Sequence, residues 1–374
     1  MANNNKHTGP NVPALRFPEF SGEWKQCQIK DFGKVITGST PPTSKTEFYD
    51  NGVFLWASPA DLGNVKDVIS TKTKLSQQGF DKCRKIPAHS ILVTCIGSTI
   101  GKMGMATTEM ATNQQINSII PIDCSPDYVY YSIQSRFPKY ITSIATQAVP
   151  ILSKSVFESL DSYKTSIEEQ NKIGKLLHLL DERIDAQSKI IEEQETLLKS
   201  LADKLISAQG ANVAICGCVD AKASTMKEGE LESHGAFPVF GASGLCGYSN
   251  EALEESDSIL VTKDGSGVGT CQYATGAHSF LGTLCSLTAK EGVYLPYVYY
   301  ALLNFNFASF KTGLAIPHIY FKDYGKAIIY CPFYDEQVRI ASGFEKIEAK
   351  IKSDTELLKQ YELQKEYLLS RMFI

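Results

Sequence analysis

The sequence predicts an α+β protein made of two repeated globular domains of mixed strands and helices, separated by two long helices. Two observations carry this prediction. The second half of the chain repeats landmarks of the first half at a nearly constant offset, and each half ends in a long segment with heptad spacing of apolar residues. A length of 374 residues also exceeds one ordinary core and fits two domain-sized units.

The clearest repeat is a β-branched run that leads into glycines. SILVTCIGSTIGK, which begins at residue 90, matches SILVTKDGSGVGT, which begins at 258, with eight of thirteen positions identical. PDYVYYSI at 126 and IEEQNKI at 167 find counterparts in LPYVYYAL at 295 and YDEQVRI at 334, so the offsets lie between 167 and 169. The chain is therefore two copies of one unit, which run from about 14 to 206 and from about 209 to 374.

Each copy ends in a helical segment with a heptad seam. The predicted seam residues are Leu177, Leu180, Ile184, Ile191 and Leu198 in the first copy, and Ile347, Ile351, Leu358, Tyr361 and Leu368 in the second. A helix over residues 173–205 would span about 50 Å, so it needs a partner along its length. The matching register predicts that the two helices pair as an intramolecular coiled coil, with Gln187 and Asp354 as polar seam residues that fix the register. Two unrelated surface helices are the alternative.

The globular parts are predicted to mix strands with short helices. VFLWA at 53, SILVT at 90, NSIIPI at 117 and SILVT at 258 are predicted strands, whereas the composition of residues 37–52 indicates a loop. PDYVYYSI and LPYVYYALLNF are predicted short helices. The predicted domain organisation is a first globular domain over 1–160, a helix over 161–208, a second globular domain over 209–333 and a second helix over 334–374.

Composition and charge narrow the class of protein. The net charge of −4 argues against a chain coated in basic residues, although residues 1–160 carry 16 Lys and Arg against 12 Asp and Glu and are net positive. The ten cysteines contain no C-x-x-C pair, so we expect reduced thiols and no metal site. No apolar run reaches the length of a membrane span, and the first ten residues are polar, so a cytoplasmic protein is expected.

The glycine-rich stretches do not match nucleotide-binding loops. Gly97 and Gly101 are separated by three residues, whereas a Walker loop has four. Gly265, Gly267 and Gly269 resemble the G-x-G-x-G of a methyl-donor or dinucleotide fold, but no acidic residue follows at the usual distance of about 20 residues. No N-P-P-Y type tetrapeptide of an adenine methyltransferase and no nucleophile motif is present, so we assign no catalytic residue.

A series of landmarks runs along both halves of the chain. The first half has VPALRFPEFSGEWK at 12, ITGSTPPTSK at 36, ATNQQINSIIPI at 111 and SIEEQNKIGKLLHLLDERID at 166, and the second has FPVFGASGLCGY at 237, SILVTKDGSGVGT at 258 and FYDEQVRIA at 333. In this order they resemble the specificity subunit of type I restriction-modification enzymes. The second copy departs from the pattern at its start, because ANVAICGCVDAK stands where a counterpart of EWK is expected.

The resemblance implies a DNA-reading subunit without catalytic activity. Its two target recognition domains would each read one half of a bipartite sequence, with pseudo-two-fold symmetry, and an antiparallel helix pair would hold them apart. A pair of about 50 Å exceeds one DNA turn of about 34 Å, so helix length would set the unread spacer. The family also implies two methyltransferase subunits that use S-adenosylmethionine and restriction subunits that use ATP and Mg, with these cofactors bound by the partners and none by this chain.

What both copies share is interpreted as scaffold, and polar or basic segments outside the match as double-stranded DNA contacts. The candidates are Ser44, Lys45, Lys66, Lys72 and Lys74 in the first domain, and Lys222, Lys227, Lys263, His278 and Lys311 in the second. Lys263 is the best placed, because it follows a strand in the shared motif yet differs from its counterpart Cys95. The competing interpretations are ordinary solvated lysines, a DNA methyltransferase in its own right, or a coiled-coil adaptor that does not bind DNA.

Overall fold

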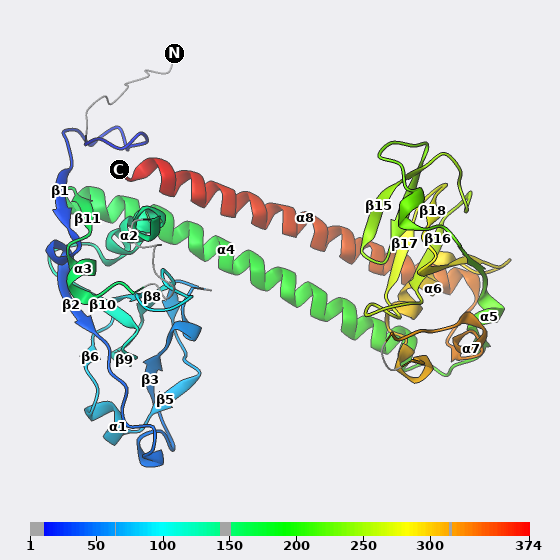
Figure 1. Cartoon of the computed structure of the whole chain (residues 1–374), viewed down its shortest axis with the longest axis horizontal. Coiled ribbons are helices and arrows are strands. Elements are labelled where there is room, and N and C mark those ends of the chain that lie inside the picture. Colours follow the sequence, from blue (N-terminus) through cyan, green and yellow to red (C-terminus); the bar gives the residue numbers. More distant parts are fainter. Residues whose placement is uncertain (1–10, 64, 143–150, 314–315) are drawn as a thin grey trace. The chain divides into compact units, whose positions relative to one another are not determined.

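The computed structural model describes residues 11–63, 65–142, 151–313 and 316–374, which belong to two compact units (Figure 1). Unit 1 comprises Met1–Lys189 and Glu356–Ile374, and unit 2 comprises Ile190–Thr355. Each unit therefore contains the globular part of one copy of the repeat and a segment of both long helices. In the described part of the chain, no helix has an apolar stretch long enough to cross a bilayer.

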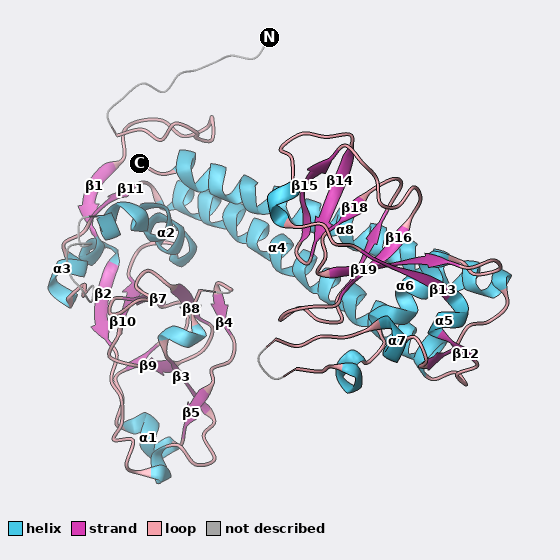
Figure 2. Ribbon diagram, turned by 45° about the vertical axis from the view of Figure 1, so that its right-hand side comes forward, coloured by secondary structure: helices cyan, strands magenta, loops and turns pink. Residues whose placement is uncertain are grey.

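Unit 1 contains a main sheet, an accessory sheet and a two-stranded ribbon (Figure 2). The main sheet has the order β2-β10-β7-β8-β4, and the order in accessory sheet 1 is β5-β3-β9-β6. The strands are β1 (Lys25–Gln28), β2 (Gly33–Thr37), β3 (Phe54–Ala57), β4 (Asp67–Val68), β5 (Thr73–Leu75), β6 (Lys85–Ile86), β7 (Ile91–Thr94), β8 (Met103–Ala106), β9 (Met110–Thr112), β10 (Ile116–Pro121) and β11 (Asp161–Lys164). The ribbon pairs β1 with β11.

The helices of unit 1 pack around the aromatic core of the main sheet, except the short helix Gln77–Asp81, which packs beside β5 of accessory sheet 1. They are α1 (Gln77–Asp81), α2 (Pro126–Thr142), α3 (Lys154–Glu158), the start of α4 (Ile167–Ala202) and the end of α8 (Tyr334–Met372), with 3-10 turns η1 (Ile29–Phe32), η2 (Thr46–Phe48) and η3 (Pro59–Asp61). Trp24 packs edge-on against Tyr128 of α2 and against Phe373, which follows α8. The segment before β1, the aromatic helix and the end of the chain therefore share one core.

Unit 2 repeats this plan with fewer strands. Its main sheet has the order β13-β19-β16-β17, accessory sheet 2 has the order β15-β14-β18, and β12 pairs with β20. The strands are β12 (Val213–Ala214), β13 (Val219–Ala223), β14 (Phe237–Gly241), β15 (Gly244–Ser249), β16 (Ser258–Thr262), β17 (Cys271–Ala274), β18 (Ser279–Phe280), β19 (Leu284–Ala289) and β20 (Ile328–Ile329). The helices are α5 (Ile215–Cys218), α6 (Leu295–Leu303) and α7 (Phe321–Tyr324), with turns η5 (Glu228–Glu230) and η6 (Phe307–Phe310), and α4 continues into a π-helical turn, η4 (Asp203–Ser207).

The two units share a scaffold and differ in their accessory sheets. The order β2-β10-β7-β8 of unit 1 corresponds to β13-β19-β16-β17 of unit 2, and the predicted strands at 53, 90, 117 and 258 are β3, β7, β10 and β16. The segment ANVAICGCVDAK forms β12, α5 and the start of β13, which take the places of β1, η1 and β2. The second copy therefore has the expected entry structure, in which Ile215 and Cys218 of α5 are buried as Ile29 and Phe32 of η1 are. No tryptophan precedes β12 as Trp24 precedes β1.

The shared glycines form a hairpin turn in each unit. Gly97 and Gly265 have φ of 94° and 95°, and Gly101 and Gly269 have φ of 92° and 91°, which L residues with a side chain rarely adopt. A Cβ on Gly101 would also lie 2.6 Å from a ring carbon of Phe137. Because this turn joins the antiparallel strands β16 and β17, Gly265-x-Gly267-x-Gly269 is not the strand-to-helix turn that a dinucleotide or methyl-donor fold requires. The glycine motif on which the methyltransferase alternative rested is therefore a hairpin turn and does not support that alternative.

A buried glutamine joins each long helix to the aromatic helix of the same unit. In unit 1, Gln170 Nε2 donates to Thr165 O at 2.7 Å, and its Oε1 accepts from Ser125 N at 3.1 Å, just before α2. In unit 2, Gln337 Nε2 donates to Pro332 O, and its Oε1 accepts from Tyr294 N, both at 2.8 Å. We call this pair of hydrogen bonds the glutamine clamp. It gives a physical reason for the glutamine of the Glu-Gln dipeptide that both copies share.

The helices α4 and α8 contact each other within each unit. In unit 1, Lys365 Nζ lies 2.6 Å from Asp181 Oδ1, and the first turns of α4 lie beside the last turns of α8 (Figure 1). In unit 2, Gln194 Nε2 donates to Asp354 Oδ2 at 2.8 Å. All ten predicted seam residues are buried or half-buried, whereas Leu179 and Leu197, one position before two of them, are exposed.

Candidate nucleic-acid interface

Ser39 organises the loop of the first domain that carries Ser44 and Lys45. Its carbonyl accepts from Trp56 Nε1 at 3.0 Å, and its Oγ accepts from Arg84 N at 2.9 Å. The loop is thereby attached to β3 and to the segment before β6. Since both partners belong to accessory sheet 1 or its edge, the polar loop is positioned over this sheet.

Four predicted residues of the first domain are exposed on this loop and on accessory sheet 1: Ser44, Lys45, Lys72 and Lys74. The end of β5 is joined to the turn after Lys45, because Ser76 Oγ donates to Glu47 O at 2.7 Å and Ser76 N donates to Phe48 O at 2.9 Å. The turn with Ser44 and Lys45 therefore lies next to the strand with Lys74. Together these side chains give the sheet edge an exposed basic surface that suits phosphate contacts.

Lys66 is placed differently from the other candidates of the first domain. Its side chain is buried, and its Nζ lies 2.7 Å from Asp127 Oδ1 and within hydrogen-bond distance of His178 Nδ1. An ammonium that is already paired inside the domain has no free surface for a phosphate. The burial of Lys66 therefore counts against a DNA contact and favours a structural role.

Two exposed basic residues of the same surface were not among the sequence candidates. Lys82 follows α1, and Arg84 precedes β6 with its backbone bonded to Ser39. Sequence reasoning missed them because no repeat partner marks this segment, whereas the alternation of basic residues in DKCRKIP is a signal that could have found them. Arg84 in particular stands beside the loop with Ser44 and Lys45.

In the second domain the best-placed candidate belongs to a polar cluster. Lys263 Nζ lies 2.7 Å from Asp264 Oδ2, and His318 Nδ1 lies 2.7 Å from Asp264 Oδ1. Partial burial raises the pKa of Asp264, but the hydrogen bonds from His318 and Lys263 outweigh it and leave the pKa below the ordinary value. The first copy has Cys95 and Ile96 at the corresponding sequence positions, so this charged cluster is specific to the second domain.

The other candidates of the second domain do not gather around Lys263. Lys227 and Lys311 are exposed, and Lys222, also exposed, donates its ammonium to the carbonyl of Leu253. His278 is fully buried, with Nε2 at 2.9 Å from Ser258 Oγ and Nδ1 at 2.8 Å from Gly276 O. His278 therefore holds the loop before β18, and its burial counts against a DNA contact.

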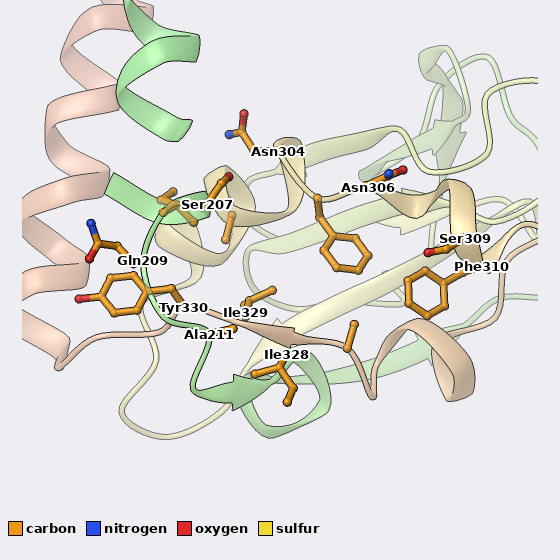
Figure 3. Close-up of a pocket in the computed structure, with 14 residues that line it drawn as sticks. Ser207, Gln209, Ala211, Asn304, Asn306, Ser309, Phe310, Ile328, Ile329 and Tyr330 are labelled. Atoms are coloured by element: carbon orange, nitrogen blue, oxygen red, sulfur yellow. The ribbon is translucent and has the colours of Figure 1, made fainter. Parts of the chain in front are cut away.

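The cavity in Figure 3 and the thiols of Cys27, Cys95 and Cys271 offer no catalytic constellation. The cavity in Figure 3, of about 330 Å³, lies in unit 2 and is lined by amides, hydroxyls and apolar groups such as Asn304, Ser309 and Ile328, without a carboxylate, imidazole or ammonium. Burial raises the pKa of Cys27 to about 11 and that of Cys95 and Cys271 to about 12, so these thiols stay protonated at neutral pH. The geometry favours a binding surface.

Comparisons with known proteins agree with a binding role. The family model described as "Type I restriction modification DNA specificity domain" matches residues 21–196 and 215–363, once in each copy. The chain is 36% identical to the type I restriction enzyme HindI specificity subunit of Haemophilus influenzae over 39% of this chain and 32% of that protein. It is 30% identical to the MjaIX specificity subunit of Methanocaldococcus jannaschii over 49% of this chain and 43% of that protein. The matches thus span less than half of either relative.

Solved structures show the same fold over nearly the whole chain. The S subunit of a type I restriction-modification system from M. genitalium superimposes with a TM-score of 0.68 at 17% identity, over 97% of this chain and 99% of that one. A chain from a structural study of the assembly and conformational transition of the type I R-M system gives 0.57 at 13% identity, over 93% of this chain and 97% of that one. Because the family model covers both copies of the repeat, the chain belongs to the specificity-subunit family of type I restriction-modification systems.

Proposed function

We propose that this chain is the DNA sequence-recognition subunit of a type I restriction-modification complex. It has no catalytic activity of its own, and each globular domain reads one half of a bipartite target. The observation that carries the proposal is one scaffold built twice, β2-β10-β7-β8 and β13-β19-β16-β17, with a different accessory sheet on each copy. Two domains with the same scaffold strands and different accessory sheets suit a target whose two half-sites differ in sequence.

The helices α4 and α8 form an antiparallel coiled coil that sets the unread spacer. Two contacts support this arrangement: Asp181 of α4 meets Lys365 of α8, and Gln194 of α4 meets Asp354 of α8, so positions rise along one helix as they fall along the other. The pair relates the two domains by pseudo-two-fold symmetry. A helix of 36 residues is about 54 Å long and exceeds one turn of DNA.

The DNA contacts come from the exposed members of the candidate set. In the first domain these are Ser44, Lys45, Lys72 and Lys74, joined by Lys82 and Arg84, and in the second they are Lys222, Lys227 and Lys311. Lys263 is half-buried and its ammonium is paired with Asp264, so it is a weaker candidate. Lys66 and His278 are left out because they are buried. Base readout comes from the polar loops over the accessory sheets, and the lysines supply phosphate contacts.

The partners are two methyltransferase subunits, which methylate an adenine in each half-site with S-adenosylmethionine, and restriction subunits, which use ATP and Mg. These cofactors are bound by the partners. Such subunits would also supply phosphate contacts that a chain with a net charge of −4 lacks.

Methylation sequencing tests the proposal. The chain is co-expressed with a cognate methyltransferase subunit, and methylated adenines are mapped across the host genome. The expected result is one bipartite motif. Replacing residues 38–89 by the corresponding segment of a relative should change one half-site and leave the other half and the spacer unchanged. Methylation that does not depend on this chain, or a single continuous motif, would refute the proposal.

Matched insertions test the spacer role. Seven residues inserted after Lys189 in α4 and seven after Thr355 in α8 lengthen both helices by about 10 Å, which corresponds to about three base pairs. We expect the spacer to widen by that amount while both half-sites stay the same. The control inserts seven residues in α4 alone, which breaks the seam and should abolish methylation. Altered half-sites with an unchanged spacer would show that the helices are not the ruler.

A further inference from the structure

A buried lysine fills a pocket at the junction of the main sheet, α2 and α4 in unit 1. Besides its bonds to Asp127 and His178, the Lys66 ammonium lies 5.6 Å from the centre of the Tyr131 ring. The backbone next to it belongs to the main sheet, because Met105 N of β8 donates to Lys66 O at 2.7 Å and β4 follows in parallel with β8. The first copy thus supplies both an ammonium and an edge strand from its own chain.

Unit 2 has a pocket at the equivalent place. The repeat aligns Tyr130 and Tyr131 of α2 with Tyr299 and Tyr300 of α6, since PDYVYYSI matches LPYVYYAL. The match of IEEQNKI with YDEQVRI, continued along the two long helices, aligns His178 with Glu345 and Asp181 with Glu348. The equivalent pairing of β7 with β8 and of β16 with β17 aligns Met105 with Tyr273. In both units the carboxylate on the long helix accepts from the tyrosine hydroxyl at 2.7 Å, from Tyr131 in one and Tyr300 in the other.

The pocket of unit 2 is open and acidic. It has a volume of about 460 Å³ and is lined by the carboxylates of Asp257, Glu345 and Glu348 and by the rings of Tyr273, Tyr299 and Tyr300. No lysine or arginine of the described residues lines it. The rings of Tyr273 and Tyr299 are 5.5 Å apart, and Tyr273 OH donates to Asp257 at 3.1 Å, so the aromatic wall is fixed in position. We call this site the acidic tyrosine pocket.

In unit 1 the pocket is filled by Lys66, which precedes β4, and by Lys365 of α8. The described part of unit 2 has no counterpart of β4 or of either lysine. β17 is the last strand of its sheet, whereas β8 is followed by β4. Lys365, whose ammonium lies 5.9 Å from the Tyr131 ring, has Leu198 at its corresponding heptad position. The acidic tyrosine pocket and the free edge of β17 therefore lie where unit 1 binds a lysine and a short strand.

We propose that the acidic tyrosine pocket binds a lysine side chain of a partner protein, whose adjoining backbone pairs with β17 as β4 pairs with β8. An ammonium would meet carboxylates and the faces of tyrosine rings, both of which attract a cation in a partly desolvated site. An exposed strand edge binds an extended segment through its backbone. The three carboxylates repel a DNA phosphate, and the described residues contain no group of side chains arranged to hold a metal ion.

The test uses the first copy's own filling segment as the probe. A peptide with the sequence of residues 62–70, LGNVKDVIS, is titrated onto the full-length chain and followed by saturation-transfer NMR, beside a peptide in which norleucine replaces the lysine. We expect millimolar binding of the lysine peptide and at least tenfold weaker binding of the norleucine peptide. Equal binding of the two peptides, or no binding of either, would overturn the proposal.

Matched variants assign the binding to this pocket. Glu348→Gln keeps an acceptor for Tyr300, and Glu345→Gln keeps the side-chain size, so both should fold, which is checked by thermal melting. Each should weaken the lysine peptide by about tenfold, because a charge-assisted contact is lost. Glu366→Gln, an exposed carboxylate of α8 outside the pocket, should have no effect. An equal loss in Glu366→Gln would mean non-specific attraction, and n-butylamine binding as tightly as the peptide would mean a general cation site; either result overturns the proposal.

Discussion

The two copies of the repeat put opposite charge on the same scaffold. Residues 38–114, which include accessory sheet 1, carry eight Lys and Arg against six Asp and Glu, whereas residues 224–283, which include accessory sheet 2, carry two against eight. The central strands β7 and β16 share the uncharged sequence ILVT, so the charge difference lies outside them. A scaffold can thus be duplicated while its surfaces diverge, and the first domain is better suited than the second to hold DNA phosphates.

The same contrast appears inside the domains. Unit 1 neutralises the carboxylates beside its aromatic helix with Lys66 and Lys365, whereas unit 2 leaves three carboxylates facing an open pocket. The carboxylates of unit 1 are therefore paired with lysines, whereas no lysine or arginine of the described residues lines the pocket that holds the carboxylates of unit 2.

The glutamine clamp should be equally important in both copies. Gln170→Leu removes the partner of the buried Ser125 amide and of the half-buried Thr165 carbonyl, and Gln337→Leu does the same to the half-buried Tyr294 and Pro332. Each substitution should lower the free energy of unfolding by about 3 kcal/mol, measured by urea denaturation. Gln364→Leu, on the exposed face of α8, is the control and should change it by less than about 0.5 kcal/mol. A large effect in one copy only would show that the clamps are not equivalent.

Lys66→Met should destabilise unit 1. The change leaves Asp127 without its cation, and because that carboxylate is partly exposed we expect a loss of about 2 kcal/mol in the free energy of unfolding. Lys74→Met, at an exposed position, should stay within about 0.5 kcal/mol. The double variant Lys66→Met/Asp127→Asn should recover part of the loss. No destabilisation by Lys66→Met would contradict a filled, structural pocket in the first copy.

Lys74→Ala should weaken DNA binding by the assembled complex. Loss of one phosphate contact should reduce the affinity for the target duplex about fivefold and lower the slope of log K against log salt by about one. Lys346→Ala, an exposed lysine of α8, is the matched control and should change neither quantity. A larger loss for Lys227→Ala than for Lys74→Ala would contradict the expectation that the first domain makes the stronger phosphate contacts.

Asp264→Asn should remove a small acid dependence of stability that the first copy lacks. The folded pKa of Asp264 lies below its unfolded value of about 3.9, so the carboxylate stabilises the fold above that pH, and the stabilisation is lost as the pH falls through the folded pKa. The partners are a quarter to a third exposed, so we expect less than about 1 kcal/mol. Thermal melts at pH 3 and pH 6 measure it. A variant with the same pH dependence as the parent chain would exclude this contribution.

Periodic features of this fold could be predicted from the sequence, because they depend on local spacing. The heptads of α4 and α8, the strands at 90 and 258 and the aromatic helices are all present. The accessory sheets were not predicted in detail, because β3 with β9 and β14 with β18 are short parallel pairs between segments far apart in the chain. The start of the second copy had no clear sequence signal, because no tryptophan precedes β12 and Cys218 stands where the first copy has Phe32.

The candidate site was predictable only as a set of exposed polar residues. The sequence alone does not distinguish an exposed lysine from a buried one. Lys66 is buried where β4 pairs with β8. His278 is buried because the loop before β18 folds back to Ser258. A hydrogen bond from the Arg84 amide to Ser39 holds Arg84 beside the loop that carries Ser44. This contact joins segments far apart in the chain, so a local sequence pattern does not predict it.

The glutamine clamp has a consequence for heredity. Because Gln170 and Gln337 each hold a long helix to the aromatic helix of the same copy, neither clamp depends on the identity of the other half. A crossover between two genes of this kind within the codons of α4 would deliver one intact clamp from each parent. Hybrids with new combinations of halves would then keep both clamps, although the core of unit 1 would receive Phe373 from the second parent. Exchange of whole domains can therefore supply diversity between parents that share this C-terminal segment.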